Sequence, residues 1–392
     1  MKIAVSGIGV VSALGAGVGC NVEALRRSES GIVKHPRLLA THLRVPVGEV
    51  PFSNGELAAM LGVGAHLSRT VLLGMLAVRE ALDDAGQVVG LRTGLVSATS
   101  VGGMDRTEDF YRSYLSNPVS GRLRDVAMHD CAASTRAIAR YCRIDGFTTT
   151  VSTACSSAAN AILLGAALLR HGVVDRVVVG GTDALSRFTL GGFKSLQILD
   201  DRPCRPFDAT RAGLNLGEGA GYLVLQRDDT LSREPYGYLA GWANANDAFH
   251  QTASSENGEG AWRAMSGALE RAGVAPGEVD YINVHGTGTP NNDLTEGRAL
   301  RRLFGDRVPP FSSTKGFTGH TLAAAGGNEA VFSVVALHRG AIWPNPNFAT
   351  PIEELGLRPE CRLREGEALG YVLSNSFGFG GNCASLLFSK NG

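Results

Sequence analysis

Two stretches of this 392-residue chain carry the same succession of short sequence patterns, and this internal repeat restricts the fold more than any other feature. In the first stretch, ALDDAG at residues 81–86 precedes the β-rich run GLVSA at residues 94–98. In the second, ALERAG at residues 268–273 precedes YINV at residues 281–284. Both copies indicate a helix that stops at a glycine and is followed by a strand.

The repeat continues downstream of these strands. STAC at residues 152–155 precedes an apolar helical run that ends at RHG, residues 170–172. STKG at residues 313–316 precedes a helical run that ends at HRG, residues 338–340. Because the order and spacing of the patterns match, we predict that the chain folds as two similar αβ halves related by duplication.

The two halves are predicted to form a layered α/β fold. The repeat breaks near Pro235, so we place the N-terminal half at residues 1–235 and the C-terminal half at residues 236–392. Strands alternate with helices in each half, which favours mostly parallel sheets covered by helices. The run at residues 158–170 is apolar nearly all round. We therefore expect this helix and its counterpart to be sealed between two sheets, in an αβαβα arrangement.

Three reactive side chains follow β-rich runs. Cys155 lies within STACSS, His285 begins HGTGT, and His320 ends KGFTGH. Ligands bind where the carboxyl ends of strands meet, and the duplication would bring the Cys155 and His320 segments opposite each other. A thiol with two imidazoles is typical of covalent catalysis assisted by two proton or hydrogen-bond donors.

Cys155 is the candidate nucleophile. It lies at a predicted strand-to-helix junction, where backbone N–H groups and the helix dipole would stabilise a thiolate and hold an oxyanion. Taken alone, such a cysteine is more often a core thiol, and each histidine is as often structural; their joint occurrence favours chemistry. The remaining cysteines form no CxxC pair and are expected to be reduced and structural. They are Cys20, Cys131, Cys142, Cys204, Cys361 and Cys383.

Neither a metal nor a nucleotide cofactor is expected. The sequence has no histidine pair or carboxylate cluster at the spacing of one helix face, so metal binding is the weaker interpretation. Gly7 and Gly9 follow the first apolar run, but the third glycine of a dinucleotide-binding loop is missing. We interpret these glycines as a structural turn.

Composition excludes several classes of function. The 37 Lys and Arg residues balance 37 Asp and Glu residues, which argues against binding nucleic acid by bulk charge. No stretch approaches the ~20 apolar residues of a membrane span. Residues 1–11 read as an opening strand rather than a signal peptide. Together with reduced cysteines, these features predict a cytoplasmic protein.

Six motifs, spread over the whole chain, resemble those of the β-ketoacyl-acyl-carrier-protein synthases, which are thiolase-like condensing enzymes. The Cys-His-His set resembles the elongating branch; the initiating branch carries Cys-His-Asn, and a thiolase carries a second catalytic cysteine. The resemblance implies a thiolase-like duplicated αβαβα layered fold. The motifs lie at residues 153–157, 205–208, 217–221, 285–290, 315–321 and 375–381.

The resemblance implies a decarboxylative condensation. Cys155 would accept an acyl chain, and a malonyl thioester would then lose carbon dioxide and attack the acyl-Cys carbonyl. The backbone N–H groups of Cys155 and Phe379 would hold the oxyanion, with the Phe379 ring as a gate. His285 and His320 would contact the malonyl thioester oxygen as neutral donors. Lys315 would orient the site with Glu329 as its partner. In addition, Val101 would line the distal acyl pocket.

The chain departs from the family pattern at a few positions. The Gly-Phe-Gly-Gly turn is ordinarily followed by Thr-Asn, but here by Asn382 and Cys383, and Ala212 stands where the family usually shows Asp. These departures spare the catalytic set. They leave open whether the pathway is fatty-acid elongation or a related polyketide or polyene pathway.

The resemblance also implies partners. We expect an acyl carrier protein as partner. Its phosphopantetheine would bring the substrate, so no other cofactor is expected. We also expect a homodimer that pairs through the strand around residues 148–151. A heterodimer with a catalytically silent relative is the alternative. Carrier proteins are acidic, so a basic patch is expected, and its candidates are Arg69, Arg202 and Arg205, the last of which could instead hold the active-site loop.

Two other functions compete with condensation. One is a weakly catalytic chain-length or partner subunit of a ketosynthase heterodimer. The other is a cysteine hydrolase that uses Cys155 with either histidine. Hydrolysis needs water at the acyl-Cys, whereas condensation must exclude it. The apolar helix after Cys155 and the gate at Phe379 favour exclusion of water, and therefore condensation.

Overall fold

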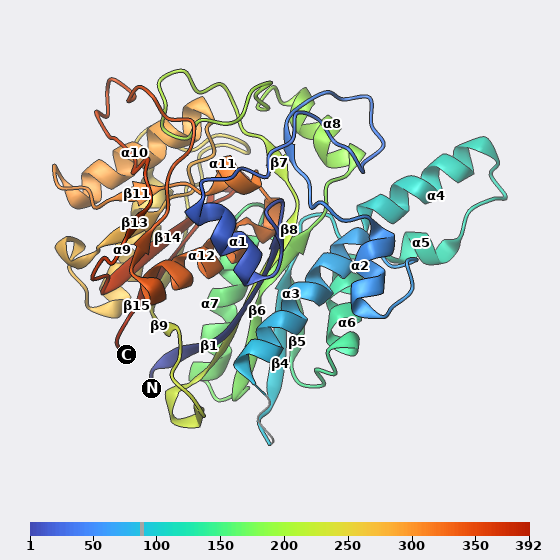
Figure 1. Ribbon diagram of the computed structural model, residues 1–392, viewed down its shortest axis with the longest axis horizontal. Helices are drawn as coiled ribbons and strands as arrows, with labels where there is room; N and C mark the ends of the chain where they lie inside the picture. Colours follow the sequence, from blue (N-terminus) through green and yellow to red (C-terminus); the bar gives the residue numbers. More distant parts are fainter. Residues whose placement is uncertain (87–89) are drawn as a thin grey trace.

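The computed structural model describes residues 1–86 and 90–392 (Figure 1). Long strands form where the sequence is continuously apolar, because these strands are covered on both faces. The strands are β1 Ile3–Ser12, β2 Gly15–Ala16, β3 Val47–Gly48, β4 Thr93–Ala98, β5 Thr148–Val151, β6 Arg176–Asp183, β7 Leu216–Gly217, β8 Gly219–Arg227, β9 Gly237–Asn246, β10 Tyr281–Asn283, β11 Phe311–Ser312, β12 Ala341–Ile342, β13 Arg364–Glu365, β14 Tyr371–Phe377 and β15 Asn382–Ser389.

Helices alternate with these strands along the chain. Several begin at a serine whose side chain accepts a hydrogen bond from the first turn, as Ser53 and Ser68 do. The α-helices are α1 Val18–Arg26, α2 Asn54–Leu61, α3 Arg69–Ala85, α4 Met104–Ser116, α5 Leu123–Ala127, α6 Cys131–Tyr141, α7 Ser157–Arg170, α8 Arg187–Ser195, α9 Glu259–Ala272, α10 Pro290–Phe304, α11 Lys315–Thr318 and α12 Ala325–Arg339.

The order and direction of the strands confirm the predicted duplication. From the centre outwards, the first half runs β1-β8-β6-β4-β5 and the second runs β9-β15-β14-β10-β11. In each half the first two pairings are antiparallel and the last two are parallel. The halves join where β1 pairs with β9, at Ala4 with Tyr238 and Val5 with Gly237.

The prediction of a turn at Gly7 and Gly9 is wrong, because both glycines lie inside β1. Their role is to let the backbone of α3 approach the strand. A Cβ atom on Gly7 would collide with the Ala81 carbonyl oxygen, and one on Gly9 with the Ala77 carbonyl oxygen. The missing side chains therefore set the depth at which α3 packs on the sheet.

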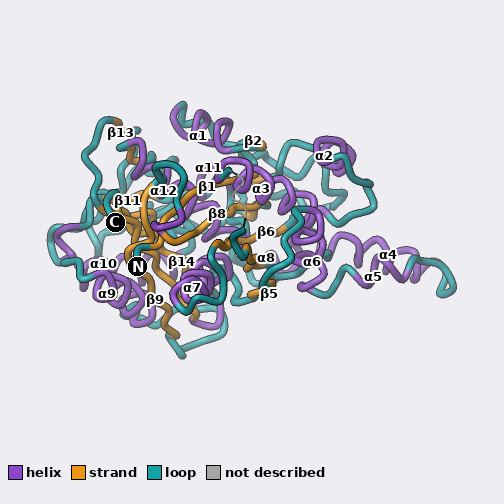
Figure 2. Tube along the Cα trace, turned by 90° about the horizontal axis from the view of Figure 1, so that it is seen from below, coloured by secondary structure: helices purple, strands orange, loops and turns teal. Residues whose placement is uncertain are grey.

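Helices cover both faces of the strands, and α7 and α12 form the central layer (Figure 2). Helix α3 packs on β1, β8 and β6 of the first half, and α9 packs on β9 and β15 of the second. The expectation of two sealed central helices holds for α12, which is buried from Ala325 to Leu337. It fails for α7, because one stripe of this helix stays half-exposed. The stripe consists of Asn160, Leu163, Leu164, Ala167 and Leu168.

Two further features concern the surface. Helices α4 and α5 project from the body of the molecule (Figure 1, Figure 2), and α4 buries none of its residues. Within the described residues, no helix combines the length and the apolar character that crossing a membrane requires.

Candidate active site

The three reactive side chains that were predicted from separate motifs meet in one cavity. Cys155, His285 and His320 all line a cavity of about 240 Å³. Cys155 comes between β5 and α7, His285 follows β10, and His320 follows β11 and α11. Strand ends therefore bring the thiol and the imidazoles together, as the position of each motif after a β-rich run indicated.

Cys155 lies at a tight junction between β5 and α7. The preceding residue, Ala154, has a φ of 53°, a conformation that a residue with a side chain rarely adopts. The Ser157 hydroxyl holds this junction by accepting a hydrogen bond of 2.8 Å from the Thr153 N–H. The thiol is 6% exposed. The strained junction thus aims a buried sulfur into the cavity.

The turn after β14 packs directly on this junction. A Cβ atom on Gly378 would lie 3.0 Å from the Thr153 carbonyl oxygen and 3.2 Å from the Cys155 nitrogen, so glycine permits the close approach. The backbone N–H of the next residue, Phe379, lowers the pKa of the Cys155 thiol. A donor at this position is suited to hold negative charge that develops at an acyl group on Cys155.

The thiol of Cys155 is protonated at rest. Burial raises its pKa to about 11, although the positive charge of Lys315 and the Phe379 N–H both lower it. The expectation of a stabilised thiolate is therefore not met, because removing water disfavours the anion more than its neighbours favour it. The thiol proton must leave as the sulfur attacks a substrate.

Both imidazoles carry their proton on Nε2. The Leu322 N–H donates to His320 Nδ1 over 3.0 Å, and the Lys315 ammonium donates to His285 Nδ1 over 3.3 Å. A ring nitrogen that accepts a hydrogen bond carries no proton, so Nε2 is the N–H of each neutral ring. The ring centroids lie 5.4 Å apart, edge to face. The two rings therefore offer a pair of N–H donors.

The electrostatics keep these rings neutral. Burial, the Lys315 charge and the neighbouring His320 together hold the pKa of His285 well below its usual value. Burial and the Lys315 charge lower the pKa of His320 to about 3. Neither ring is therefore charged at neutral pH, and each can donate its N–H without first taking up a proton.

This electrostatic arrangement predicts an acid-sensitive fold. The unfolded chain protonates each histidine below pH ~6.5, whereas the folded chain does not, so the free energy of unfolding falls as the pH drops through this range. We expect wild type to lose about 1.4 kcal/mol more per pH unit than His320→Asn between about pH 6 and 4. Urea unfolding at several pH values measures the difference, and parallel pH profiles would contradict it.

Lys315 and Glu329 lie together behind the imidazoles. The Lys315 ammonium donates to the Glu329 carboxylate and, over 2.6 Å, to the His285 carbonyl oxygen. Both side chains are buried. Burial raises the pKa of Glu329 to about 7, and the Lys315 charge opposes this shift. Lys315 therefore fixes the position of the His285 ring while Glu329 compensates its charge.

Removing one member of this buried pair should destabilise the fold strongly. Lys315→Met is expected to lower the free energy of unfolding by about 3–5 kcal/mol, because it leaves the Glu329 carboxylate unpaired. Adding Glu329→Met should recover most of that loss. Lys194→Met is the control, because Lys194 pairs with Asp201 at the surface and should contribute no more than about 1 kcal/mol. Equal losses at the two lysines, measured by urea unfolding, would refute the coupling.

The structure corrects the predicted carrier-protein contacts. Arg69 is 8% exposed and its guanidinium is bound by Glu218 over 2.6 Å, so it has no free surface for a partner. Arg205 pairs with Asp200 over 2.6 Å with its side chain 11% exposed, which fits the alternative of holding the nearby loop. Of the three arginines, only Arg202 presents a largely exposed side chain, at 64%. Sequence alone did not distinguish these environments.

The assignment of Val101 to the distal acyl pocket stays a prediction. Val101 lies half-buried in the loop after β4 and is not among the described residues that line the Cys155 cavity. Asp183 fastens this loop by accepting hydrogen bonds from the Thr99 hydroxyl, over 2.6 Å, and from the Ser100 N–H. The loop is thus held against the end of β6.

The sequence reasoning missed Phe193. This residue of α8 lines the cavity and stacks on the gate residue Phe379, with ring centroids 5.8 Å apart and an angle of 19° between the rings. Stacked aromatic rings attract each other, so Phe193 stabilises the present position of the Phe379 ring. No motif marks Phe193, because the contact joins segments far apart in the sequence.

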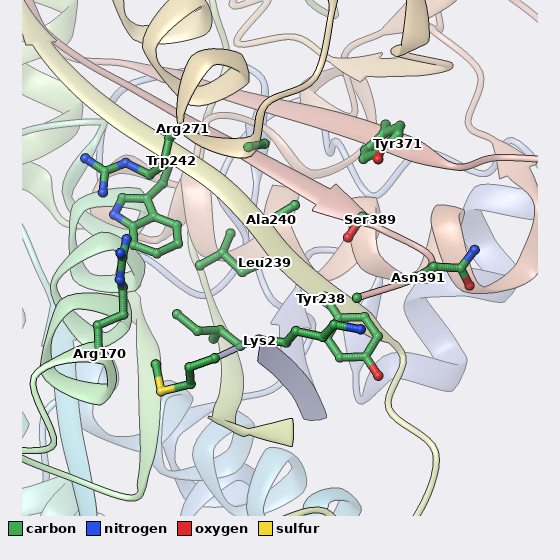
Figure 3. Close-up of a pocket in the computed structure, with 14 residues that line it drawn as sticks. Lys2, Arg170, Tyr238, Leu239, Ala240, Trp242, Arg271, Tyr371, Ser389 and Asn391 are labelled. Atoms are coloured by element: carbon green, nitrogen blue, oxygen red, sulfur yellow. The ribbon is translucent and has the colours of Figure 1, made fainter. Parts of the chain in front are cut away.

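A second cavity lies near the chain termini (Figure 3). It has a volume of about 410 Å³, and the Trp242 ring lies between the guanidinium groups of Arg170 and Arg271. None of the described residues that line it is a cysteine or a histidine. Arg170 ends α7, whereas Cys155 precedes the start of that helix. We therefore place the candidate active site in the smaller cavity, which Cys155 and the two imidazoles line.

In a layered α/β fold, a nucleophilic thiol beside donors that stay neutral is the arrangement of a condensing enzyme, in which a carbon nucleophile attacks an acyl-cysteine. Residues 1–230 match the family described as Beta-ketoacyl synthase, N-terminal domain, and residues 236–349 match Beta-ketoacyl synthase, C-terminal domain. The chain belongs to the β-ketoacyl synthase family. This membership confirms the predicted class of acyltransferase.

Curated relatives match the chain over its whole length. The 3-oxoacyl-acyl-carrier-protein synthase 2 of Staphylococcus aureus (strain MRSA252) is 30% identical over 412 residues, covering 100% of this chain and 98% of the relative. The protein of the same name from Vibrio cholerae serotype O1 is 31% identical over 412 residues, covering 99% of each chain. These relatives span both predicted halves.

Solved structures confirm the predicted thiolase-like fold. The ishigamide ketosynthase/chain length factor superposes with a TM-score of 0.92 at 30% identity, covering 100% of this chain and 99% of that one. A ketosynthase, ApeO, in complex with its chain length factor, ApeC, from Xenorhabdus doucetiae superposes with a TM-score of 0.86 at 32% identity, covering 99% and 98% of the two chains.

Proposed function

We propose that this chain elongates an acyl group held on Cys155 by condensing it with a malonyl group held on an acyl carrier protein. The observation that carries the proposal is the pair of neutral Nε2–H donors, on His285 and His320, in the cavity that Cys155 and Phe379 also line. Such a site can stabilise negative charge on two different carbonyl oxygens.

The first half-reaction loads the cysteine. The Cys155 sulfur attacks the acyl thioester of the carrier protein, a new S–C bond forms, and the bond to the pantetheine sulfur breaks. The thiol proton passes to that leaving sulfur. The backbone N–H groups of Cys155 and Phe379 hold the oxyanion of the tetrahedral intermediate.

The second half-reaction forms the carbon–carbon bond. The malonyl thioester loses carbon dioxide, and the electron pair of the broken C–C bond forms an enolate whose oxygen receives the N–H groups of His285 and His320. The enolate carbon then attacks the acyl-Cys carbonyl, and the Cys155 sulfur leaves and takes up one proton from solvent, which restores the thiol. The product is a β-ketoacyl group on the carrier protein, and no cofactor beyond its phosphopantetheine is proposed.

An acyl carrier protein is the proposed partner. Relatives named 3-oxoacyl-acyl-carrier-protein synthase 2 match nearly the whole chain, and their name includes the acyl carrier protein. Arg202 is the proposed contact because its side chain is 64% exposed. The proposed pathway is fatty-acid elongation or a related polyketide or polyene pathway; the relatives include 3-oxoacyl-acyl-carrier-protein synthases and ketosynthases with chain length factors.

A dimer is proposed, built on β5 and α7. Strand β5 is the last strand of the sheet path, and half-exposed apolar side chains of α7, Leu164 among them, lie next to it. An unpaired strand edge beside an apolar stripe favours pairing with a second chain. That chain is a second copy or, as the alternative, a catalytically silent relative; the ketosynthase ApeO was solved in complex with its chain length factor, ApeC.

The proposed organisation follows the duplication. The halves are taken as residues 1–235 and 236–392. The first family match ends at residue 230 and the second begins at residue 236, which supports a boundary near residue 235. A cytoplasmic location is proposed because each of the seven cysteines, all within the described residues, is a free thiol.

Intact-protein mass spectrometry with a panel of acyl-carrier thioesters tests the proposal. An adduct on Cys155 with the mass of the acyl group is expected, and the preferred acyl length would point to the pathway. A chain that takes no acyl group from any primer would instead be a silent partner subunit. An adduct that water releases as free acid would identify a cysteine hydrolase.

A further inference from the structure

We propose that Asn382 is a positioning residue that holds the turn carrying Phe379 against the Cys155 junction, so that the Phe379 N–H faces the acyl group on Cys155. This inference rests on the proposed function. Asn382 follows the turn that carries Phe379. Its carboxamide oxygen reaches partners on helix α7 and on strand β9.

The main chain of Asn382 closes the turn that carries Phe379. Its carbonyl oxygen accepts a hydrogen bond of 2.8 Å from the Gly378 N–H. Asn382 is also the first residue of β15, and it pairs with Asn246 of β9. The turn is therefore anchored at its base to the sheet, and Phe379 projects from that anchored base.

The side chain of Asn382 is fixed by a closed set of hydrogen bonds. Its Oδ1 accepts from Asn160 Nδ2 over 2.7 Å and from Asn244 Nδ2 over 2.9 Å. Asn160 Nδ2 also donates to Thr153 Oγ1 over 2.9 Å and, over a longer 3.3 Å, to Ser156 Oγ, and Asn244 Nδ2 also donates to Asn160 Oδ1 over 2.7 Å. Both amide groups thus use both hydrogens, which fixes the orientation of each side chain.

These bonds reach the segment that holds the nucleophile. Asn160 lies in the first turn of α7, and the Ser156 hydroxyl, next to Cys155, lies 2.8 Å from Asn382 Oδ1. Asn382 therefore contacts the Phe379 turn through its carbonyl oxygen and the Cys155 junction through its side chain. The distance between the Phe379 N–H and the sulfur depends on both contacts being kept.

The consequence is a selective kinetic effect. The Phe379 N–H serves the steps in which charge develops on an acyl group at Cys155, namely loading and carbon–carbon bond formation. Decarboxylation of malonyl-carrier protein depends instead on His285 and His320, which have no contact with Asn382 among the hydrogen bonds of the described residues. A change at position 382 should therefore slow acyl transfer and spare decarboxylation.

The test compares three variants with wild type. Asn382→Leu removes the acceptor, Asn382→Asp keeps it, and Asn391→Leu makes the same exchange at an exposed residue beyond the far end of β15. For Asn382→Leu we expect acyl transfer to Cys155, followed by intact mass, to slow about 10- to 100-fold. Carbon dioxide release from malonyl-carrier protein should stay within about twofold. Asn382→Asp should recover acyl transfer, and Asn391→Leu should behave as wild type.

The outcomes separate this inference from the proposed function. A wild-type chain that forms no adduct would overturn the proposed function itself. A wild-type chain that forms the adduct, beside an Asn382→Leu variant that loads at the same rate or loses both activities equally, overturns only the role of Asn382. If Asn382→Leu does not fold, Asn244→Ala removes one donor from the exposed side of the network. Slower loading with unchanged decarboxylation in that variant supports the inference, and unchanged loading overturns it.

Discussion

Cys155→Ala is expected to abolish the acyl adduct and to lower condensation by about 10⁴-fold or more, because the step it removes has no other nucleophile. Cys155 lines the cavity together with both imidazoles and with Phe379. The fold should persist, since alanine fits a junction already built from small side chains. Intact-mass analysis after mixing with an acyl-carrier thioester measures the adduct, and product analysis measures condensation.

Carbon dioxide release from malonyl-carrier protein gives this prediction a second readout. Decarboxylation uses the imidazole donors, so Cys155→Ala should retain it. Cys142→Ala is the matched control, because Cys142 is also a shielded thiol, with its pKa raised to about 12 by burial, but lies at the end of α6. An adduct that survives in Cys155→Ala, or disappears in Cys142→Ala, would contradict the assignment of the nucleophile.

His320→Ala and His285→Ala are each expected to slow decarboxylation about 10²- to 10³-fold, because each removes one of two N–H donors that hold the enolate oxygen. Loading of Cys155 should fall much less, since the oxyanion of that step is held by backbone N–H groups. His320→Asn, which keeps an N–H donor, should recover part of the loss. Single-turnover measurements of adduct formation and of carbon dioxide release separate the two steps.

The exposed His171, which follows α7, provides the control for the histidine variants. His171→Ala should leave both rates unchanged. If removing His320 slowed loading as much as decarboxylation, the imidazoles would act on the cysteine itself, as the hydrolase alternative requires. The ratio of the two effects therefore distinguishes a condensing site from a Cys-His nucleophile pair.

The fold was predictable because the same succession of sequence patterns occurs in both halves of the chain. The paired patterns around residues 81–98 and 268–284 correspond to α3 with β4 and to α9 with β10, and the strand orders of the two halves match. The reactive residues were predictable for a related reason. Cys155, His285 and His320 each follow a strand, and parallel strands bring their carboxyl ends to one edge.

Other features depend on tertiary contacts that leave no local pattern. The sequence around Arg69 does not indicate its buried pair with Glu218. In the same way, no motif indicates that Phe193 stacks on Phe379 in the cavity. The pKa of Cys155 could not be predicted either, because burial, which dominates it, is a property of the packed molecule. Sequence indicated which residue types were available, and packing decided which of them met.

Helix α7 shows a further reason for such differences. Its sequence is apolar nearly all round, which predicts burial on every side. A single chain buries only part of it and leaves Leu163, Leu164 and Leu168 half-exposed beside the edge strand β5. The apolar composition of α7 predicts that its side chains will be buried, but it does not indicate whether this chain or another chain buries them.

The most direct test of the central claim is a single-turnover condensation. Wild type is first acylated on Cys155, freed of excess primer, and mixed with malonyl-carrier protein while the masses of enzyme and carrier are followed. We expect the acyl adduct to disappear from Cys155. At the same time a β-ketoacyl group, two carbons longer than the primer, should appear on the carrier, and one carbon dioxide should be released. Loss of the adduct as free acid, or an adduct that malonyl-carrier protein does not discharge, would contradict condensation.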